Sequence, residues 1–284
     1  MSLLEEIRRT LNAYRIHPKK KLGQNFLVDE GILEKIISYA SLENDDVVLE
    51  IGAGLGFLTE CLAKEAKRVI AVEIDPKLTR ILVRRLRKYE NVTILRGDIM
   101  KIEVPEFNKV VSIPPYSISS PLIFWLLQKD FKCAVLTFQE EFARRLAAAP
   151  GTKDYGRLTV TVYYHAEVEL LDSIPKESFW PMPEVNSMII RLKPREPPFH
   201  VEDEEKFFSF IRAIFTQKNK KLRNAIMPFL SEIRIPKKDA VSLADSIPFS
   251  YRRVREMMPE ELGLTFNHLI KRLYEMNSAA LKSD

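Results

Sequence analysis

The stretch Val47-Val48-Leu49-Glu50-Ile51-Gly52-Ala53-Gly54-Leu55-Gly56 decides the fold. Its first half is β-branched and apolar, and its second half is a short glycine-rich turn. Apolar residues then recur at helical spacing from Phe57 to Leu62. This order predicts a buried parallel strand, a tight turn and the start of a helix. Glycine suits such a turn because it tolerates positive φ and because its missing Cβ lets a ligand approach the backbone.

A second apolar run, residues 69–75, predicts the next strand and ends in carboxylates. Glu73 lies 73 − 52 = 21 residues after Gly52. Nucleotide-binding βαβ units place at this spacing the acid that binds ribose hydroxyls. Glu73 is therefore a candidate ribose ligand.

The glycine pattern is G-x-G-x-G rather than the G-x-G-x-x-G of pyrophosphate binders, and no P-loop lysine follows it. Glu50 precedes the turn, and an acid at this place suits a cationic ligand better than a pyrophosphate. The turn resembles the S-adenosylmethionine turn of class I methyltransferases. A dehydrogenase-type turn, or a purely structural one, is the alternative.

Composition limits the class of protein. The chain has 284 residues, 46% hydrophobic and 29% charged, which predicts one sizeable core and a smaller domain. No apolar run reaches the roughly 18 residues of a membrane span. The start carries acids instead of a signal peptide, so we expect a cytoplasmic monomer without a membrane partner. Cys61 and Cys133 are expected to be buried thiols, and the four histidines show no metal-ligand spacing.

The order of elements predicts two domains. Further strands are expected at residues 92–95, 109–113, 133–138, 158–164 and 187–192. The pattern predicts a doubly wound, mostly parallel, seven-stranded α/β sheet with an antiparallel edge. Strand signals vanish after the proline-rich linker 194–198, which predicts a small helical domain. We therefore expect a first domain over residues 1–194, with a basic N-terminal arm, and a small helical domain over residues 195–284.

Ligands of open α/β sheets bind beyond the carboxyl ends of the strands. At the end of the third strand, Asp98 could accept from an adenine amino group or could merely cap a helix. The fourth strand ends in Ile113-Pro114-Pro115-Tyr116. Prolines cannot continue a central strand, and they leave carbonyl acceptors at a rigid corner beside an aromatic ring. Acceptors and a stacking ring are what methylation of an exocyclic amine on a flipped-out base requires, although a plain turn with a core tyrosine is the alternative.

Six motifs together resemble those of the small-subunit ribosomal RNA adenine N6,N6-dimethyltransferases, in order along the chain. They are residues 21–27 (Lys-Leu-Gly-Gln-Asn-Phe-Leu), 49–54, 97–98, 115–121, 179–187 (Phe-Trp-Pro-Met-Pro-Glu-Val-Asn-Ser) and 215–223. The resemblance implies transfer of four methyl groups from S-adenosylmethionine to N6 of two adjacent adenosines in the last hairpin of the RNA, as part of ribosome biogenesis. It implies that residues 1–194 are the catalytic domain and that residues 195–284 bind RNA. It also implies that Tyr116 and Phe179 hold the target base. It places the cofactor near Asn25, Leu27, Glu50, Gly52, Gly54, Glu73, Asp98 and Ile113.

One position departs from the family. The strand-four motif of the family begins with asparagine, whereas this chain has Ile113, and Ser112 is out of register by one residue. Backbone carbonyls of Ile113 and Pro114 could still accept from N6. Two rivals follow, a weak or inactive assembly factor that binds the same RNA, and a DNA adenine methyltransferase. The latter would normally carry Asp-Pro-Pro-Tyr and a target-recognition insert that is not seen here.

RNA binding is predicted from basic clusters rather than from the net charge of +5. Each cluster alone is more often a solvated helix face, but together they could line one phosphate-tracking cleft. The clusters are Lys19-Lys20-Lys21, Arg144-Arg145, Lys218-Lys220-Lys221-Arg223 and Arg252-Arg253-Arg255.

Overall fold

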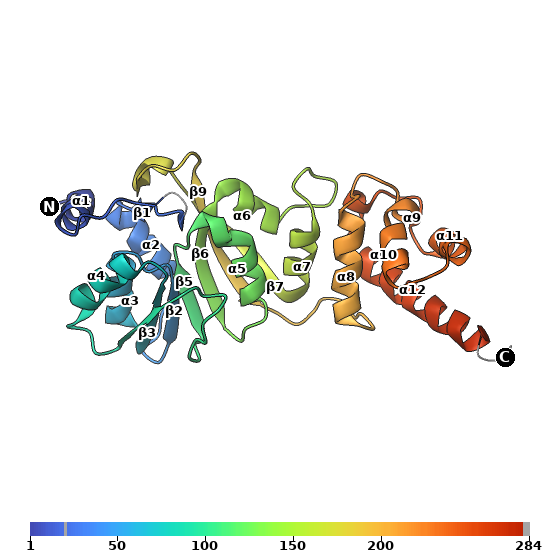
Figure 1. Cartoon of the computed structure of the whole chain (residues 1–284), viewed down its shortest axis with the longest axis horizontal. Helices are drawn as coiled ribbons and strands as arrows, with labels where there is room; N and C mark the ends of the chain where they lie inside the picture. The colour runs from blue at the N-terminus through green and yellow to red at the C-terminus, as the bar shows by residue number, and fades with distance from the viewer. Residues whose placement is uncertain (20–21, 281–284) are drawn as a thin grey trace. The chain divides into compact units, whose positions relative to one another are not determined.

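The computed structural model describes residues 1–19 and 22–280, with side chains described through Met276. Internal contacts divide the chain into two compact units (Figure 1). The first unit comprises Met1–Arg144 and Glu167–Pro194, and the second comprises Arg145–Ala166 and Arg195–Asp284. Among the described residues, no helix has the length and apolar character that crossing a membrane requires.

The first unit is an α/β sheet with helices packed beside it (Figure 1). Its helices are α1 (Leu3–Ala13), α2 (Glu30–Ala40), α3 (Phe57–Glu65), α4 (Pro76–Leu86), α5 (Ser119–Leu126) and the start of α6 (Glu140–Leu146). Its main-sheet strands are β2 (Val47–Ile51), β3 (Arg68–Glu73), β4 (Val92–Arg96), β5 (Lys109–Ser112), β6 (Cys133–Gln139), β7 (Ala166–Ile174) and β9 (Ser187–Pro194).

The seven strands lie in the order β4-β3-β2-β5-β6-β9-β7. Pairing is parallel from β4 through β6, and β9 joins β6 antiparallel. The predicted fold class is confirmed. The strand order reverses beside β2, so the carboxyl ends of β2 and β5 flank the switch point at which open α/β sheets bind ligands. A separate antiparallel ribbon joins β1 (Phe26–Leu27) to β8 (Phe179–Trp180).

One predicted strand was wrong. Residues 158–164 lie in helix α7 (Arg157–His165), and β7 supplies the seventh strand instead. The β-branched residues favour a strand by propensity, but burial decides here. Val160 and Tyr164, one helical turn apart, are buried in the core of the second unit, and Thr161 Oγ1 donates to the carbonyl of Arg157 at 3.0 Å. The predicted domain boundary also differs. Residues 145–166 were expected in the first domain, but their contacts group them with the second unit.

The second unit is helical. Besides α7 it contains α8 (Glu204–Phe215), α9 (Leu222–Ala225), α10 (Met227–Glu232), α11 (Lys237–Ser246) and α12 (Pro259–Ala280). Helix α8 contacts α7, α9, α10 and α12 (Figure 1). Its apolar residues Phe207, Phe210 and Ile214 are fully buried at helical spacing, so they form the core of this unit.

Candidate functional site

The glycine turn after β2 lies tightly against the end of β5. Gly52 has a φ of 80° and Gly54 a φ of 59°, a backbone region that side chains other than glycine rarely adopt. A Cβ at Gly52 would lie 2.9 Å from Cδ of Pro115, so any larger residue would displace the proline corner. The glycine turn and Pro115 are therefore in close contact at the carboxyl ends of β2 and β5.

The carboxyl ends of β2, β3, β4 and β5 enclose one cavity of about 860 Å³, open solvent included. It brings together nine of the predicted site residues: Asn25, Gly52, Gly54, Glu73, Asp98, Ile113, Pro114, Pro115 and Tyr116. A smaller adjoining cavity of about 440 Å³ is lined by Leu27 and Glu50. Asn25, Gly52 and Ile113 line both cavities, so they lie where the two spaces meet.

Glu50 is the most unusual group in the site. It is 2% exposed, and its Oε2 is buried without a hydrogen-bond partner among the described residues. Burial, and to a lesser extent the neighbouring charge of Glu73, raises the pKa of Glu50 to about 8. A buried carboxylate without a partner is costly, so the site suits a ligand that brings a positive charge to it.

Glu73 is held by backbone amides. Its Oε2 accepts from the amide of Gly54 at 2.9 Å, and its Oε1 accepts from the amide of Asp75 at 2.7 Å. Burial nevertheless raises the pKa of Glu73, because these hydrogen bonds offset only part of the desolvation. Each carboxylate oxygen has a second lone pair, so Glu73 can also accept from the hydroxyls of a ligand.

Asp98 lines the larger cavity, where it could contact a ligand. Its Oδ1 accepts from the amide of Met100 at 3.1 Å within a turn, and no helix begins there for it to cap. Lys101 lies 3.7 Å from its Oδ2.

The end of β5 is fixed from several sides. The buried Ser112 donates to the carbonyl of Ile51 and accepts from the amide of Ile51 at 3.2 Å, so its hydroxyl serves the sheet and not the cavity. Ile113 is half-buried and lines both cavities. The Tyr116 hydroxyl makes a short hydrogen bond with Ser187, and burial raises the pKa of Tyr116 to about 12. The tyrosine therefore stays neutral, with its ring orientation fixed.

Phe179 lies in the β1–β8 ribbon, opposite Leu27. It is 3% exposed, belongs to the core of the first unit, and lines neither cavity. Its neighbour Trp180 is half-buried, with Arg8 of α1 at 5.5 Å from the ring centroid. The ribbon joins the segment before α2 to the Phe179–Ser187 loop.

Two polar residues that had no predicted role, Gln24 and Asp75, meet beside the larger cavity, which Gln24 lines. Asp75 is buried and accepts from Gln24 Nε2 at 3.1 Å, and Lys19 Nζ lies 2.8 Å from the same oxygen. Burial opposes ionisation of Asp75, but the hydrogen bond from Lys19 lowers its pKa below the ordinary value. These contacts tie Lys19 and Gln24 to the end of β3, so Lys19 has a structural partner. The carboxylates that end strand 69–75 were the available signal.

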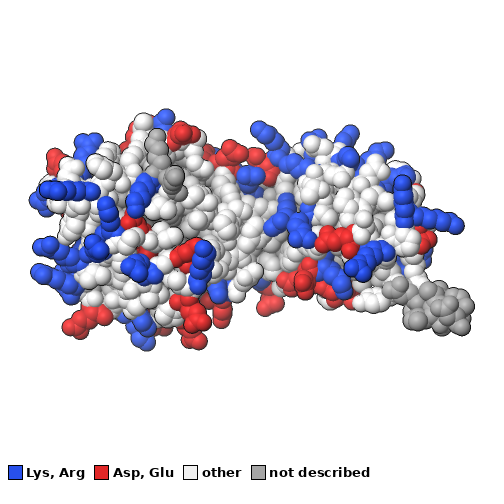
Figure 2. Space-filling view, viewed as in Figure 1, with Lys and Arg blue, Asp and Glu red and all other residues white. Residues whose placement is uncertain are grey.

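The residues of the predicted basic clusters differ in their exposure and in whether their charged groups already have partners in the protein. Lys20 and Lys21 lie outside the described residues. Arg144 pairs with Glu140 on α6, and Arg145 is exposed. Lys218 donates to the carbonyls of Lys153 and Tyr155, whereas Lys220 and Lys221 are exposed, and Arg223 pairs with Asp245 at 2.9 Å. In Figure 2, Lys and Arg side chains stand over both units with Asp and Glu between them.

Comparisons with known proteins agree with this geometry. A profile of the family described as Ribosomal RNA adenine dimethylase matches residues 16–260. A Methanosarcina acetivorans protein named "Probable ribosomal RNA small subunit methyltransferase A" is 46% identical over 265 residues, covering 93% of this chain and 97% of the relative. A protein of the same name from Methanopyrus kandleri is 42% identical, with coverages of 87% and 90%.

Solved structures agree as well. A dimethyladenosine transferase from Plasmodium falciparum has a TM-score of 0.72 and 33% identity, over 89% of this chain and 98% of that one. The 23S rRNA methyltransferase ErmE has a TM-score of 0.65 and 30% identity, with coverages of 86% and 99%.

Proposed function

Because the chain belongs to the ribosomal RNA adenine dimethylase family and is a methyltransferase, we propose that it dimethylates N6 of two adjacent adenosines in the last hairpin of small-subunit ribosomal RNA. S-adenosylmethionine is the proposed methyl donor. The immature small subunit is the proposed substrate, and the helical second unit is proposed to bind its RNA.

The observation that carries the cofactor assignment is the buried, unpartnered Oε2 of Glu50 next to the glycine turn. S-adenosylmethionine has two cationic groups and no phosphate, so a carboxylate suits it where a P-loop would not. Bound there, it would supply an electrophilic methyl group. Glu73 would accept from its ribose hydroxyls and Asp98 from its adenine amine, with Asn25 and Leu27 beside it.

The proline corner is proposed to orient the target amine. The lone pair of N6 is delocalised into the adenine ring, so acceptors must hold the N–H groups while the nitrogen becomes nucleophilic. Ile113 brings no side-chain acceptor, so the carbonyls of Ile113 and Pro114 would take that role. Tyr116, oriented by Ser187, would stack on the base. Positioning then supplies most of the catalysis.

Phe179 is proposed as the second face of the base sandwich. It would have to leave its buried position, since it lines neither cavity.

Ile113 also favours a second candidate function, an assembly factor that binds the same RNA with little or no methyl transfer. Incubation with labelled S-adenosylmethionine and either undermethylated small subunits or duplex DNA tests the proposal. We expect dimethyladenosine in the ribosomal RNA alone. Tight binding to the subunits without label transfer would support the assembly factor, and labelled DNA would support a DNA methyltransferase.

A further inference from the structure

Two basic segments of the second unit, residues 218–223 and 250–255, are joined by backbone hydrogen bonds. The amides of Leu222 and Arg223 donate to the carbonyls of Arg252 and Ser250 at 2.8 and 2.9 Å. The amides of Val254 and Arg255 donate to the carbonyls of Lys220 and Lys218 at 3.2 and 3.0 Å. An isolated antiparallel bridge pairs Lys221 with Arg253. Two clusters about thirty residues apart in the chain therefore form one surface.

Tyr251 lies on this surface, and the charged groups of Lys221 and Arg223 lie near its ring. It is 63% exposed, Lys221 Nζ lies 5.6 Å from its ring centroid, and Arg223 Cζ lies 5.4 Å from it. Both distances are within the range of cation–π attraction. Arg223 Nη1 also donates to the Tyr251 hydroxyl at 3.4 Å, while Nη2 of the same guanidinium lies 2.9 Å from Asp245 Oδ1.

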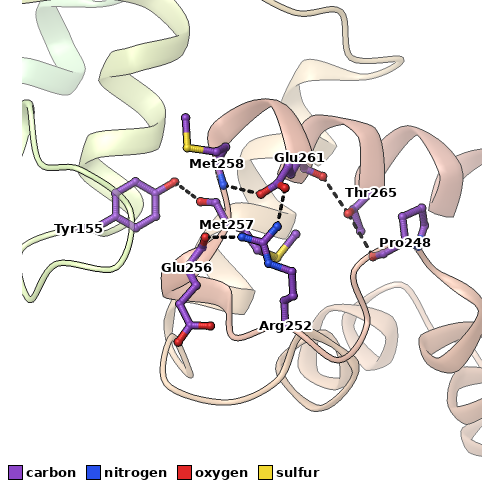
Figure 3. Close-up of polar contacts among 8 residues, drawn as sticks. All are labelled: Tyr155, Pro248, Arg252, Glu256, Met257, Met258, Glu261 and Thr265. Carbon is purple, nitrogen blue, oxygen red and sulfur yellow. Dashed lines mark hydrogen bonds and ion pairs between the residues drawn. The ribbon is translucent and has the colours of Figure 1, made fainter.

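The loop that carries Tyr251 is anchored on both sides, as Figure 3 shows. Before it, the carbonyl of Pro248 accepts from Thr265 at 3.4 Å. After it, Arg252 pairs with Glu261 and donates to the carbonyl of Glu256 at 2.7 Å (Figure 3). Tyr155 donates to the carbonyl of Met257 at 2.8 Å, and the amide of Met258 donates to Glu261 at 2.8 Å. The backbone on both sides of Tyr251 is thus already ordered in the folded protein. This order lowers the entropy cost of binding a ligand to the Tyr251 ring.

A single exposed tyrosine is ordinary and needs no explanation. An exposed ring that is preorganised and flanked by cations has the composition of single-stranded nucleic acid sites, in which aromatic rings stack on bases and cations contact phosphates. We propose that Tyr251 stacks on an unpaired base of RNA, separate from the target adenosine, while Lys220 and Lys221 contact the adjoining phosphates. This inference rests on the proposed function, since it assumes an RNA substrate.

The same geometry divides the predicted basic cluster by role. The ammonium of Lys218 donates to the carbonyls of Lys153 and Tyr155. The guanidinium of Arg223 pairs with Asp245 and donates to the Tyr251 hydroxyl. These two residues position the surface. Lys220 and Lys221 are the exposed cations that remain for phosphate.

The test compares Tyr251→Ala, Tyr251→Phe and a matched control, Tyr274→Ala, in the full chain. Tyr274 is 65% exposed on α12 and lies in neither basic segment. Binding is measured by fluorescence anisotropy with a labelled, unstructured oligoadenylate and with undermethylated small subunits, at several salt concentrations. We expect Tyr251→Ala to raise Kd by about 5- to 150-fold, the range for loss of one stacked base. Tyr251→Phe and Tyr274→Ala should stay near the unaltered protein.

The salt dependence separates stacking from charge. Stacking releases no counterions, so the slope of log K against log salt should not change in Tyr251→Ala. Equal affinities of Tyr251→Ala and Tyr274→Ala would overturn the inference. A flattened slope would also overturn it, because Tyr251 would then act only by positioning Lys221. If the unaltered protein methylates and binds subunits while Tyr251→Ala matches it, only this inference fails. If the unaltered protein does neither, the proposed function fails too.

Discussion

Replacement of Glu50 by glutamine should stabilise the protein without cofactor and weaken its affinity for the cofactor. The pKa of this carboxyl is about 8 in the folded chain against an ordinary 4.5, so folding favours the protonated form. The resulting penalty is absent below pH 4.5, grows as the pH rises to about 8, and is constant above that. At about 1.4 kcal/mol per unit of pKa difference, it reaches at most about 5 kcal/mol above pH 8.

The measurement is the free energy of unfolding of both proteins, without cofactor, from pH 5 to 9. The amide that Glu50→Gln introduces does not titrate, so its burial costs the same at every pH and the pH-dependent difference isolates ionisation. We expect this difference to favour Glu50→Gln increasingly up to about pH 8. Parallel stability curves would refute the reasoning, since they would mean that Glu50 ionises at an ordinary pH in the folded protein.

Binding gives a second readout of the same group. At pH 7 a carboxyl with a pKa of about 8 is about 0.9 protonated, so a cationic ligand that ionises it should release about 0.9 proton. Calorimetry of S-adenosylmethionine binding at pH 7, in buffers of different ionisation enthalpy, measures this release. Glu50→Gln should release about one proton fewer and bind more weakly. Equal proton release by the two proteins would refute a contact between Glu50 and the cationic part of the cofactor.

Three further changes test the other parts of the site. Glu73→Ala should weaken S-adenosylmethionine binding by about 1.5–3 kcal/mol by calorimetry, and unchanged affinity would mean that Glu73 is not the ribose ligand. Ile113→Asn should raise the single-turnover methylation rate by up to about 10²- to 10³-fold, because it restores an acceptor near N6, and should change cofactor affinity little. A lower rate would mean that the backbone carbonyls already suffice. Lys220→Gln combined with Lys221→Gln should flatten the salt dependence of RNA binding by about 1.4–1.8, at about 0.7–0.9 counterion per contact, and an unchanged slope would place both lysines outside the RNA surface.

The sheet could be predicted from the sequence because its signals are local. Apolar runs, the glycine turn after Ile51 and the carboxylates at strand ends each lie within a few residues, and parallel topology then brings the strand ends together. The positions assigned to the cofactor accordingly line the two adjoining cavities. Their roles remain predictions.

The predictions that were wrong or incomplete concern features that depend on contacts between residues distant in the sequence. Residues 158–164 read as a strand because β-branched side chains dominate, and only burial of Val160 and Tyr164 in the helical core reverses that preference. Lys218 read as a phosphate ligand, because nothing in the sequence shows that its ammonium meets the carbonyl of Lys153. The sequence around Tyr251 does not indicate a binding role, because the cations near its ring, Lys221 and Arg223, lie about thirty residues earlier in the chain.

The β1–β8 ribbon has a consequence for chimaeras built between relatives. Leu27 faces Phe179 and Phe26 faces Trp180, and the amide of Val28 donates to the carbonyl of Ser178 at 2.8 Å. Two stretches of chain about 150 residues apart are thus one structural piece. A graft of residues 178–187 alone would pair a foreign strand with the native one. The smallest exchangeable part consists of both strands, taken together from the same donor.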